Sequence, residues 1–215
     1  GGGIYSDGTT VNDEITGGII NISGGVVSEN KAVHGGGIRG GGASFLLSGD
    51  AVIRDNTASG SGGGVYSFRR FNLSGGTISE NKAEKTGGGV FVQGSTGSFT
   101  MEGGTISENT ATSNGGGVYT AGTFTMSSGT ISKNEAATGG GIDCVGGTMS
   151  MSGGSIAENT ATANGGGVRA SGTSFTMTGG EISKNKAANG GGVDCTAGTM
   201  SMSGGSITEN TATTN

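Results

Sequence analysis

Residues 115–138 read GGGVYTAGTFTMSSGTISKNEAAT, and this stretch decides the fold. It contains three short apolar segments, around Val118, Phe124 and Ile131, which are separated by Gly-rich or Asn-containing turns. Alternation of apolar and polar residues with a period of two is typical of strands with one buried face. The apolar side chains are therefore expected to point inward, and the neighbouring Tyr119 outward.

This stretch is one of eight similar repeats. Gly-Gly-Gly followed by Val or Ile recurs about every 25 residues, and the triplets begin at Gly1, Gly35, Gly62, Gly87, Gly115, Gly139, Gly165 and Gly190. An Asn three residues after an apolar residue keeps the same period, at Asn30, Asn56, Asn81, Asn109, Asn134, Asn159, Asn185 and Asn210. Two independent markers with one period indicate a repeat array, in which each repeat is one structural unit.

Three short strands in about 25 residues are typical of one coil of a parallel β-helix. We predict an all-β fold, a right-handed parallel β-helix (β-solenoid) with three short strands per coil and about eight coils. The apolar residues of successive coils fall at matching positions, so they form continuous columns inside the stack. A single β-helix domain is expected over 1–215, with repeats at 1–34, 35–61, 62–86, 87–114, 115–138, 139–164, 165–189 and 190–215.

The composition excludes several classes of protein. Gly makes up 52 of the 215 residues, but the apolar residues keep fixed positions in the repeat, which argues against a disordered chain. The net charge is −5 and the basic residues are scattered, so no nucleic-acid partner is expected. No stretch is long and apolar enough for membrane insertion. Because residue 1 is Gly and starts a repeat, we expect a processed product, a cut domain or part of a longer protein.

Catalytic chemistry is not predicted. The one His, His34, falls in a turn, and Asp143 and Asp194 are separated by a coil that carries Arg169. We therefore expect no enzyme activity, no cofactor and no metal site. Cys144 and Cys195 occupy the same position two coils apart, a separation of about 9.6 Å, beyond the reach of a disulfide. Both are expected to be reduced and buried as small apolar residues.

Two repeated motifs are interpreted as structural. The eight Asn residues are predicted to form an asparagine ladder, in which each side-chain amide bonds to the backbone and to the Asn of the next coil. The Gly triplets are expected to supply a positive φ angle or a close backbone approach at a corner. The residue before each Asn alternates in charge over five coils, and this alternation favours correct register between coils; its members are Glu108, Lys133, Glu158, Lys184 and Glu209.

Outward Ser and Thr residues form a regular array over five coils, which includes Thr100, Thr125 and Thr176. One interpretation is that Ser and Thr are simply suitable residues for the solvent face of a strand. A second is O-glycosylation or contact with carbohydrate. A third is ice binding through a flat lattice of hydroxyls and methyl groups.

The residues that follow the Gly triplets form another outward column. Tyr66, Phe91 and Tyr119 are predicted to stack as an exposed aromatic strip, which could bind sugars or could serve only to stabilise the stack. Further along, Asp143, Arg169 and Asp194 are predicted to form a ladder of salt bridges.

Two repeats depart from the common length. The first has surplus residues around Ser6–Gly18, which we expect to form a protruding loop. The second has one extra residue between Ser48 and Asn56, which we interpret as a β-bulge.

The run Ile-x-x-Asn-x-Ala followed by Gly-Gly-Gly-Val, seen from Ile106 to Val118 and from Ile156 to Val168, resembles the repeat of chlamydial polymorphic outer membrane proteins. It is also similar to the Gly- and Thr-rich repeats of adhesin-like surface proteins of bacteria and archaea. The resemblance implies a solenoid in a secreted or surface protein.

These observations lead to an expected function. We expect an extracellular or cell-surface β-solenoid with a structural or adhesive role, either in a surface stalk or in a fibre built by end-to-end stacking. Its partners would be other copies of itself or neighbouring repeats of a longer chain, together with glycans or a host surface. The alternatives are an ice-binding protein that uses the Thr and Ser array, and a β-helix that binds or degrades polysaccharide.

Overall fold

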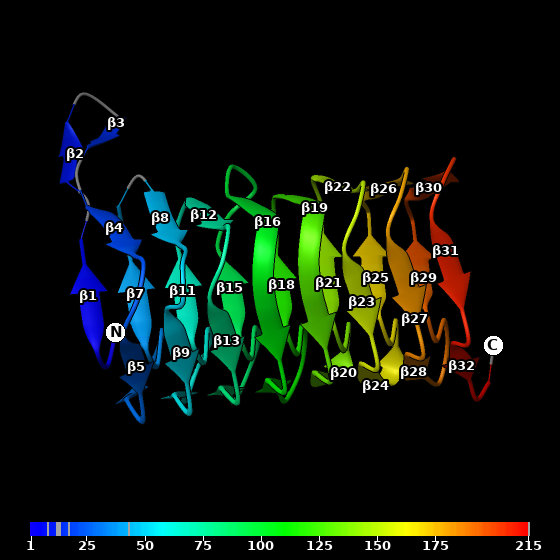
Figure 1. The fold of residues 1–215 in the computed structure, drawn as a ribbon, viewed down its shortest axis with the longest axis horizontal. Coiled ribbons are helices and arrows are strands. Elements are labelled where there is room, and N and C mark those ends of the chain that lie inside the picture. Colours follow the sequence, from blue (N-terminus) through cyan, green and yellow to red (C-terminus); the bar gives the residue numbers. More distant parts are fainter. Residues whose placement is uncertain (8, 12–13, 17, 43, 215) are drawn as a thin grey trace.

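The computed structural model describes residues 1–7, 9–11, 14–16, 18–42 and 44–214, and it describes no side chains from 8 to 17. Its regular structure is entirely β, and the coils stack into one elongated body with the chain ends at opposite ends of the stack (Figure 1). Equivalent strands of successive coils pair in parallel. The predicted all-β parallel β-helix of about eight coils is confirmed, and its strands form three long parallel sheets.

Sheet 1 contains the strand that follows each Gly triplet. Its eight strands pair in chain order, and they are β1 (Ile4–Ser6), β7 (Ile38–Gly40), β11 (Val65–Ser67), β15 (Val90–Val92), β18 (Val118–Thr120), β21 (Ile142–Val145), β25 (Val168–Ser171) and β29 (Val193–Thr196).

Sheet 2 has 14 strands and combines the second and third apolar segments of the repeat. The strands of the second segment are β4 (Ile19–Ile22), β8 (Ser44–Leu47), β12 (Arg70–Leu73), β16 (Ser98–Ser107), β19 (Thr123–Ser132), β22 (Thr148–Met151), β26 (Ser174–Met177) and β30 (Thr199–Met202). Those of the third are β5 (Val26–Ser28), β9 (Val52–Arg54), β13 (Thr77–Ser79), β23 (Ser155–Ala157), β27 (Glu181–Ser183) and β31 (Ser206–Thr208). In two coils the segments fuse, because β16 and β19 each run through ten residues.

Sheet 3 consists of strands that the sequence pattern does not predict. It lies directly after the Asn turn, and its members are β6 (Lys31–Ala32), β10 (Thr57–Ala58), β14 (Lys82–Ala83), β17 (Thr110–Ala111), β20 (Glu135–Thr138), β24 (Thr160–Asn164), β28 (Lys186–Ala187) and β32 (Thr211–Ala212). Most of these strands are two residues long, too short to show an alternating pattern.

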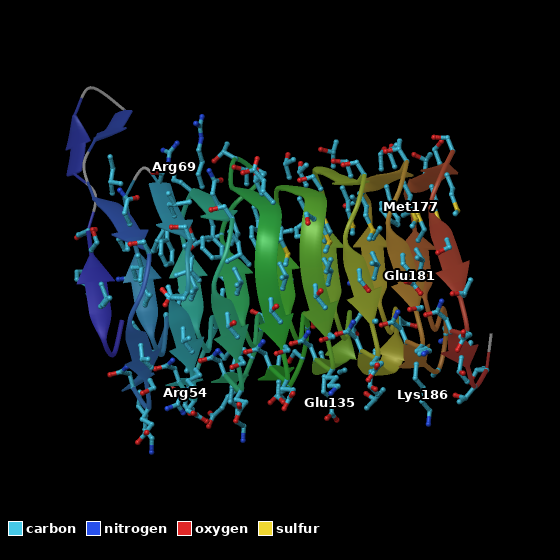
Figure 2. All side chains as sticks on the ribbon, viewed as in Figure 1. Arg54, Arg69, Glu135, Met177, Glu181 and Lys186 are labelled. Carbon is cyan, nitrogen blue, oxygen red and sulfur yellow. The ribbon has the colours of Figure 1, made fainter. Side chains whose placement is uncertain are left out.

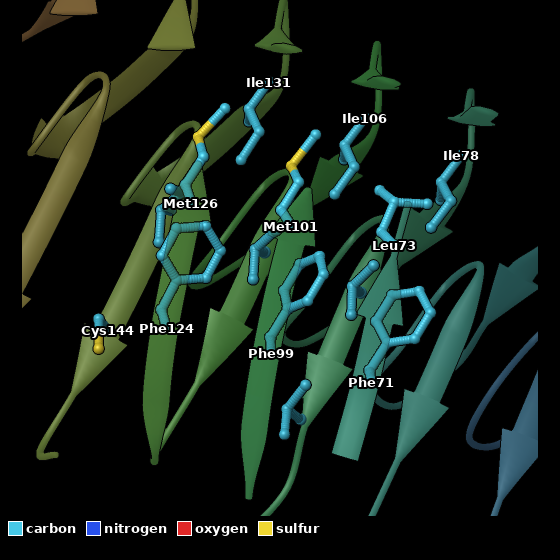
Figure 3. Packing of buried hydrophobic residues seen from close by; sticks show 14 of the residues in the cluster. Phe71, Leu73, Ile78, Phe99, Met101, Ile106, Phe124, Met126, Ile131 and Cys144 are labelled. Carbon is cyan, nitrogen blue, oxygen red and sulfur yellow. The ribbon is translucent and has the colours of Figure 1, made fainter. Parts of the chain in front are cut away.

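The core is a set of columns that run along the stack. Phe45, Phe71 and Phe99 lie one above another, with ring centroids 4.8 Å apart at each step. Leu, Met and Ile side chains from sheet 2 pack beside them (Figure 3). Each fully buried large side chain contributes about 1.5–3 kcal/mol, and one coil supplies only a few of them. Stability therefore depends on contacts between coils.

The first Gly of each triplet from the second coil onward has a positive φ angle, between 58° and 70°. At the second Gly a side chain would collide with backbone: a Cβ on Gly116 would lie 2.4 Å from the carbonyl oxygen of Gly140. The expected roles of the triplet, positive φ and close backbone approach, are both confirmed.

The two irregular coils differ from expectation in detail. The surplus of the first coil contains two strands, β2 (Thr9–Val11) and β3 (Glu14–Thr16), which pair antiparallel and project from the stack (Figure 1). Residues 8, 12, 13 and 17 of this segment lie outside the described residues. The predicted bulge of the second coil is wrong: the surplus lies in the turn between β8 and β9, because a turn absorbs a residue without breaking strand pairing.

The last coil exposes positions that are buried elsewhere. Met200, Met202 and Ile207 are 38%, 45% and 37% exposed, whereas Met177 and Ile182 one coil earlier are fully buried. Cys195 is half-buried for the same reason, so the prediction that both cysteines are buried is wrong for Cys195 and right for Cys144. Both thiols are free, as expected.

Candidate ligand-binding faces

The outward column of sheet 1 is in register over all eight coils. The pairing places Tyr5, Arg39, Tyr66, Phe91, Tyr119, Asp143, Arg169 and Asp194 on successive rungs. One end of this column therefore combines Arg39 with aromatic residues, and the other end carries the oppositely charged Asp143, Arg169 and Asp194.

The predicted aromatic stack is present. The ring centroids of Tyr66 and Phe91 are 4.7 Å apart with an interplanar angle of 22°, and those of Phe91 and Tyr119 are 5.1 Å apart with an angle of 4°. Near-parallel rings at this separation are offset-stacked, so each ring covers part of its neighbour's face. The strip is less open than expected, because Tyr66 is only 8% exposed and the other two are half-buried.

Tyr66 is buried by residues that the repeat pattern does not place on this face. The rings of His34 and Phe68 each lie 5.1 Å from the Tyr66 ring, and the Tyr66 hydroxyl donates a hydrogen bond to Gln93. Burial raises the pKa of Tyr66 above its ordinary value. Phe68 lies beyond the repeated motif in its coil and has no equivalent in other coils, so the repeat pattern gave no signal for it.

Arg39 lies among these rings. Its guanidinium carbon is 4.9 Å from the centroid of Phe68, 5.3 Å from that of Tyr5 and 5.8 Å from that of Tyr66. Its buried Nε has no hydrogen-bond partner, and among the described side chains no carboxylate lies within ion-pair distance. Cation–π contacts therefore hold this guanidinium in place.

Asp143, at the other end of the column, is fully buried. Its carboxylate accepts hydrogen bonds from Asn114 Nδ2 at 2.7 Å and from Arg169 at 3.2 Å. Burial raises the pKa of Asp143 above its ordinary value, although Arg169 and Asn114 act in the opposite direction. The carboxylate is thus paired within the protein and closed to solvent.

The predicted three-residue salt-bridge ladder is half right. Arg169 pairs with Asp143, but Asp194 instead accepts a hydrogen bond from the hydroxyl of Thr196 at 3.0 Å. Asn114 completes the group, and it was missed because the residue before each Gly triplet is variable: Thr86, Thr138 and Asn164 take its place in other coils.

The hydroxyl array lies on the outer side of sheet 2. Thr100, Thr125, Ser150 and Thr176 pair in register on successive strands. Thr100 and Thr125 are half-buried, while Thr176 is exposed. Neighbouring hydroxyls bond to one another, as between Ser150 and Thr125 at 3.4 Å. The array is regular, but part of its hydrogen-bonding capacity is used between coils.

The asparagine ladder is present as predicted. Asn81 shows the pattern: its Nδ2 donates to Ser79 O, Ile53 O and Asn109 Oδ1, each within 3.0 Å. Its backbone N–H donates to the same oxygen of Asn109. Asn56, Asn81, Asn109, Asn134, Asn159 and Asn185 are buried, so the ladder is an internal polar spine and no ligand surface.

The charged residue before each ladder Asn has a role that the sequence did not reveal. All eight have a left-handed backbone, with φ between 54° and 60°; they are Glu29, Asp55, Glu80, Glu108, Lys133, Glu158, Lys184 and Glu209. This conformation is costly for a non-Gly residue, and here it turns the chain so that the Asn enters the core. Of the alternating charges, Lys184 and Glu209 form an exposed pair at 3.9 Å.

Within the described part of the chain, no group of three or more His, Cys, Asp or Glu residues is arranged to hold a metal ion. In that same part, no helix has the length and apolar character needed to cross a membrane.

Together, the fold and the ladder define a parallel β-solenoid repeat protein. Residues 103–121 match the family model described as the Chlamydia polymorphic membrane protein repeat. The matched segment runs from the end of β16 through the Asn109 turn and the Gly115–Gly117 triplet into β18. The predicted resemblance to chlamydial repeats is thereby confirmed. No curated protein and no solved structure matches the chain.

Proposed function

We propose that this chain is a surface-associated, adhesin-like β-solenoid that holds a ligand face away from the cell. The observation that carries this proposal is the match of residues 103–121 to a membrane-protein repeat, because the matched residues are those that build the coil: the left-handed turn, the ladder Asn and the Gly triplet. A stack of such coils is stiff and extended, as a stalk requires.

The same coils support a role in assembly. Met200, Met202 and Ile207 expose core positions at one end of the stack, and the strand edges there carry backbone groups that a further coil would pair. A neighbouring repeat of a longer chain, or a second copy stacked head to tail, would cover them. Electron microscopy of the purified chain distinguishes these two possibilities. Filaments would support stacking between copies, whereas dispersed monomers would oppose it.

The proposal includes the absence of catalysis. Asp143 is the most buried acid of the candidate face, and it is paired with Arg169 and Asn114. A general acid or base must reach its substrate, and this carboxylate does not reach solvent. Cleavage of a uronate polymer by the purified chain, lost in Asp143→Asn, would contradict this part of the proposal.

Ice binding is a second candidate, favoured by the registered hydroxyls of Thr100, Thr125 and Thr176. The interruption of this array by Ser150, and the hydrogen bonds between its members, make it less suited to an ice lattice. Thermal hysteresis with shaped ice crystals would favour this candidate.

Surface location is tested by inserting an epitope tag at Ser95 in the full-length protein. Ser95 is exposed and lies in the turn between β15 and β16, outside every sheet. We expect the tag antibody to label intact cells. Labelling that requires permeabilised cells would overturn the proposed location.

A further inference from the structure

The surroundings of Arg39 differ from those of the other arginine in the same column. Arg169 lies between Asp143 and Asp194 and bonds to the first of them at 3.2 Å. Arg39 occupies the same position of the coil on β7, between Tyr5 and Tyr66. Among the described side chains, its guanidinium contacts aromatic rings and no carboxylate. Arg169 is paired with a carboxylate, whereas Arg39 has no such partner in the part of the chain whose side chains are described.

Other basic groups gather around this cation. His34 and Lys85 lie at the corner beside it, where the charges of Arg39 and Lys85 both act on the His34 imidazole. The pKa of His34 is lowered by burial and then by the positive charges of Arg39 and Lys85. Glu84, the acid next to Lys85 in sequence, instead lines a shallow groove over sheet 3 with Lys31 and Lys82. The positive charges of Arg39 and Lys85 thus lie near one another on a chain whose net charge is −5.

We propose that Arg39, together with Lys85 and the ring of Phe68, forms a subsite for the carboxylate or sulfate group of an acidic polysaccharide. The anion would bond to the Arg39 guanidinium, which has no carboxylate partner among the described side chains. This inference rests on the proposed function, since it names the ligand class of the proposed surface face.

Two features favour a saccharide over an acidic peptide. A peptide in an extended conformation commonly binds a sheet by pairing with a free strand edge. The strand that carries Arg39, β7, has no free edge, because it is already paired with β1 and β11. Aromatic rings lie next to the cation, and the neutral amide of Gln93 bonds to one of them, Tyr66. Sugars bind to combinations of aromatic and neutral polar groups through their C–H groups and hydroxyls.

Isothermal titration tests the proposal with four probes: polygalacturonate, dextran sulfate, neutral dextran and polyglutamate. We expect the purified chain to bind one or both acidic polysaccharides and not to bind neutral dextran. This binding should weaken as the salt concentration increases. Arg39→Gln should weaken binding by about tenfold or more. The matched control Lys186→Gln removes an exposed charge at the opposite edge from Arg69 (Figure 2), and it should change binding by less than about twofold.

Lys85→Gln provides a second test that does not depend on the packing of Arg39, because Lys85 is exposed; it should weaken binding in the same direction. Unfolding curves of all variants show whether the fold is retained. The proposal is overturned if Arg39→Gln and Lys186→Gln behave alike, if no acidic polysaccharide binds, or if polyglutamate binds as tightly. The epitope-tag experiment tests the surface location independently of these titrations. A negative titration result would therefore reject the anion subsite without rejecting the proposed function.

Discussion

Asn109 Nδ2 donates a hydrogen bond to Asn134 Oδ1 at 3.0 Å, and both side chains are buried one coil apart. The same Nδ2 also lies 2.9 Å from Ile78 O and 3.0 Å from Ser107 O. One side chain therefore connects three coils, since Ile78 precedes it by a coil and Asn134 follows it by one. The ladder satisfies backbone groups that the turn would otherwise bury without partners.

Replacing Asn109 by Ala should lower the free energy of unfolding by about 2–4 kcal/mol, because several buried polar groups lose a partner at once. The matched control is Asn72→Ala, since Asn72 is exposed on β12 and should cost less than about 0.5 kcal/mol. Chemical denaturation of both variants measures the difference. Equal costs would show that the ladder adds nothing beyond an ordinary surface amide.

The left-handed residues before the ladder provide a stabilising change. Glu158 has a φ of 58°, so Glu158→Gly should raise the free energy of unfolding by about 1 kcal/mol, because Gly adopts this conformation without strain. Glu158→Gln separates the two interpretations of this position: it keeps the strain and removes the charge. Exposure limits the charge contribution to about 0–1 kcal/mol, so little change is expected. A loss of stability in both variants would instead support the register role of the alternating charges.

The pH dependence of stability should report Asp143. Burial raises its pKa in the folded state, so folding favours the protonated form. The corresponding stabilisation is fully present below the pKa of the unfolded chain and is lost as pH rises through the folded-state pKa. The stability of the wild type minus that of Asp143→Asn should therefore decrease as the pH rises above about 4, the ordinary pKa of an Asp side chain. A difference that stays flat or increases, measured by denaturation at a series of pH values, would show that Arg169 dominates over burial.

The two cysteines should react at different rates. Cys144 is fully buried and burial raises its pKa to about 11, whereas Cys195 is half-buried in the last coil. A thiol reagent at neutral pH should label Cys195 first and leave Cys144 unmodified until the chain unfolds. Mass spectrometry of the labelled peptides identifies the site, and Cys195→Ser is the control. Early labelling of Cys144 would indicate that the coils open locally.

The fold could be predicted from the sequence because the residue pattern of one coil recurs eight times. A single short apolar segment, such as that around Ile131, does not distinguish a strand from a helix. The same position is Ile or Val in every repeat, and stacked coils bury such a column of residues. The ladder Asn residues were predictable on the same grounds. Sheet 3 was not, because a two-residue strand such as Thr110–Ala111 has no periodicity of its own.

The candidate face was harder to predict, because it depends on residues that occur once. The stack of Tyr66, Phe91 and Tyr119 follows from a column, and the structure contains it. The contacts of Arg39 with Phe68, and of Asp143 with Asn114, join positions at different places in the repeat. Side-chain length and local packing decide such contacts, and neither is visible in a repeat pattern.

Amide hydrogen exchange of the Gly triplets tests the central claim most directly. A Gly-rich chain without stacked coils would exchange these amides within the time of an unstructured peptide. In the solenoid, the N–H groups of Gly88, Gly116 and Gly140 each donate to the next coil at 3.0 Å, and all three residues are buried. We predict that these amides exchange as slowly as those of the core strands β15 and β18. Fast exchange at the triplets, with protection confined to the apolar segments, would contradict the stacked solenoid and the surface role built on it.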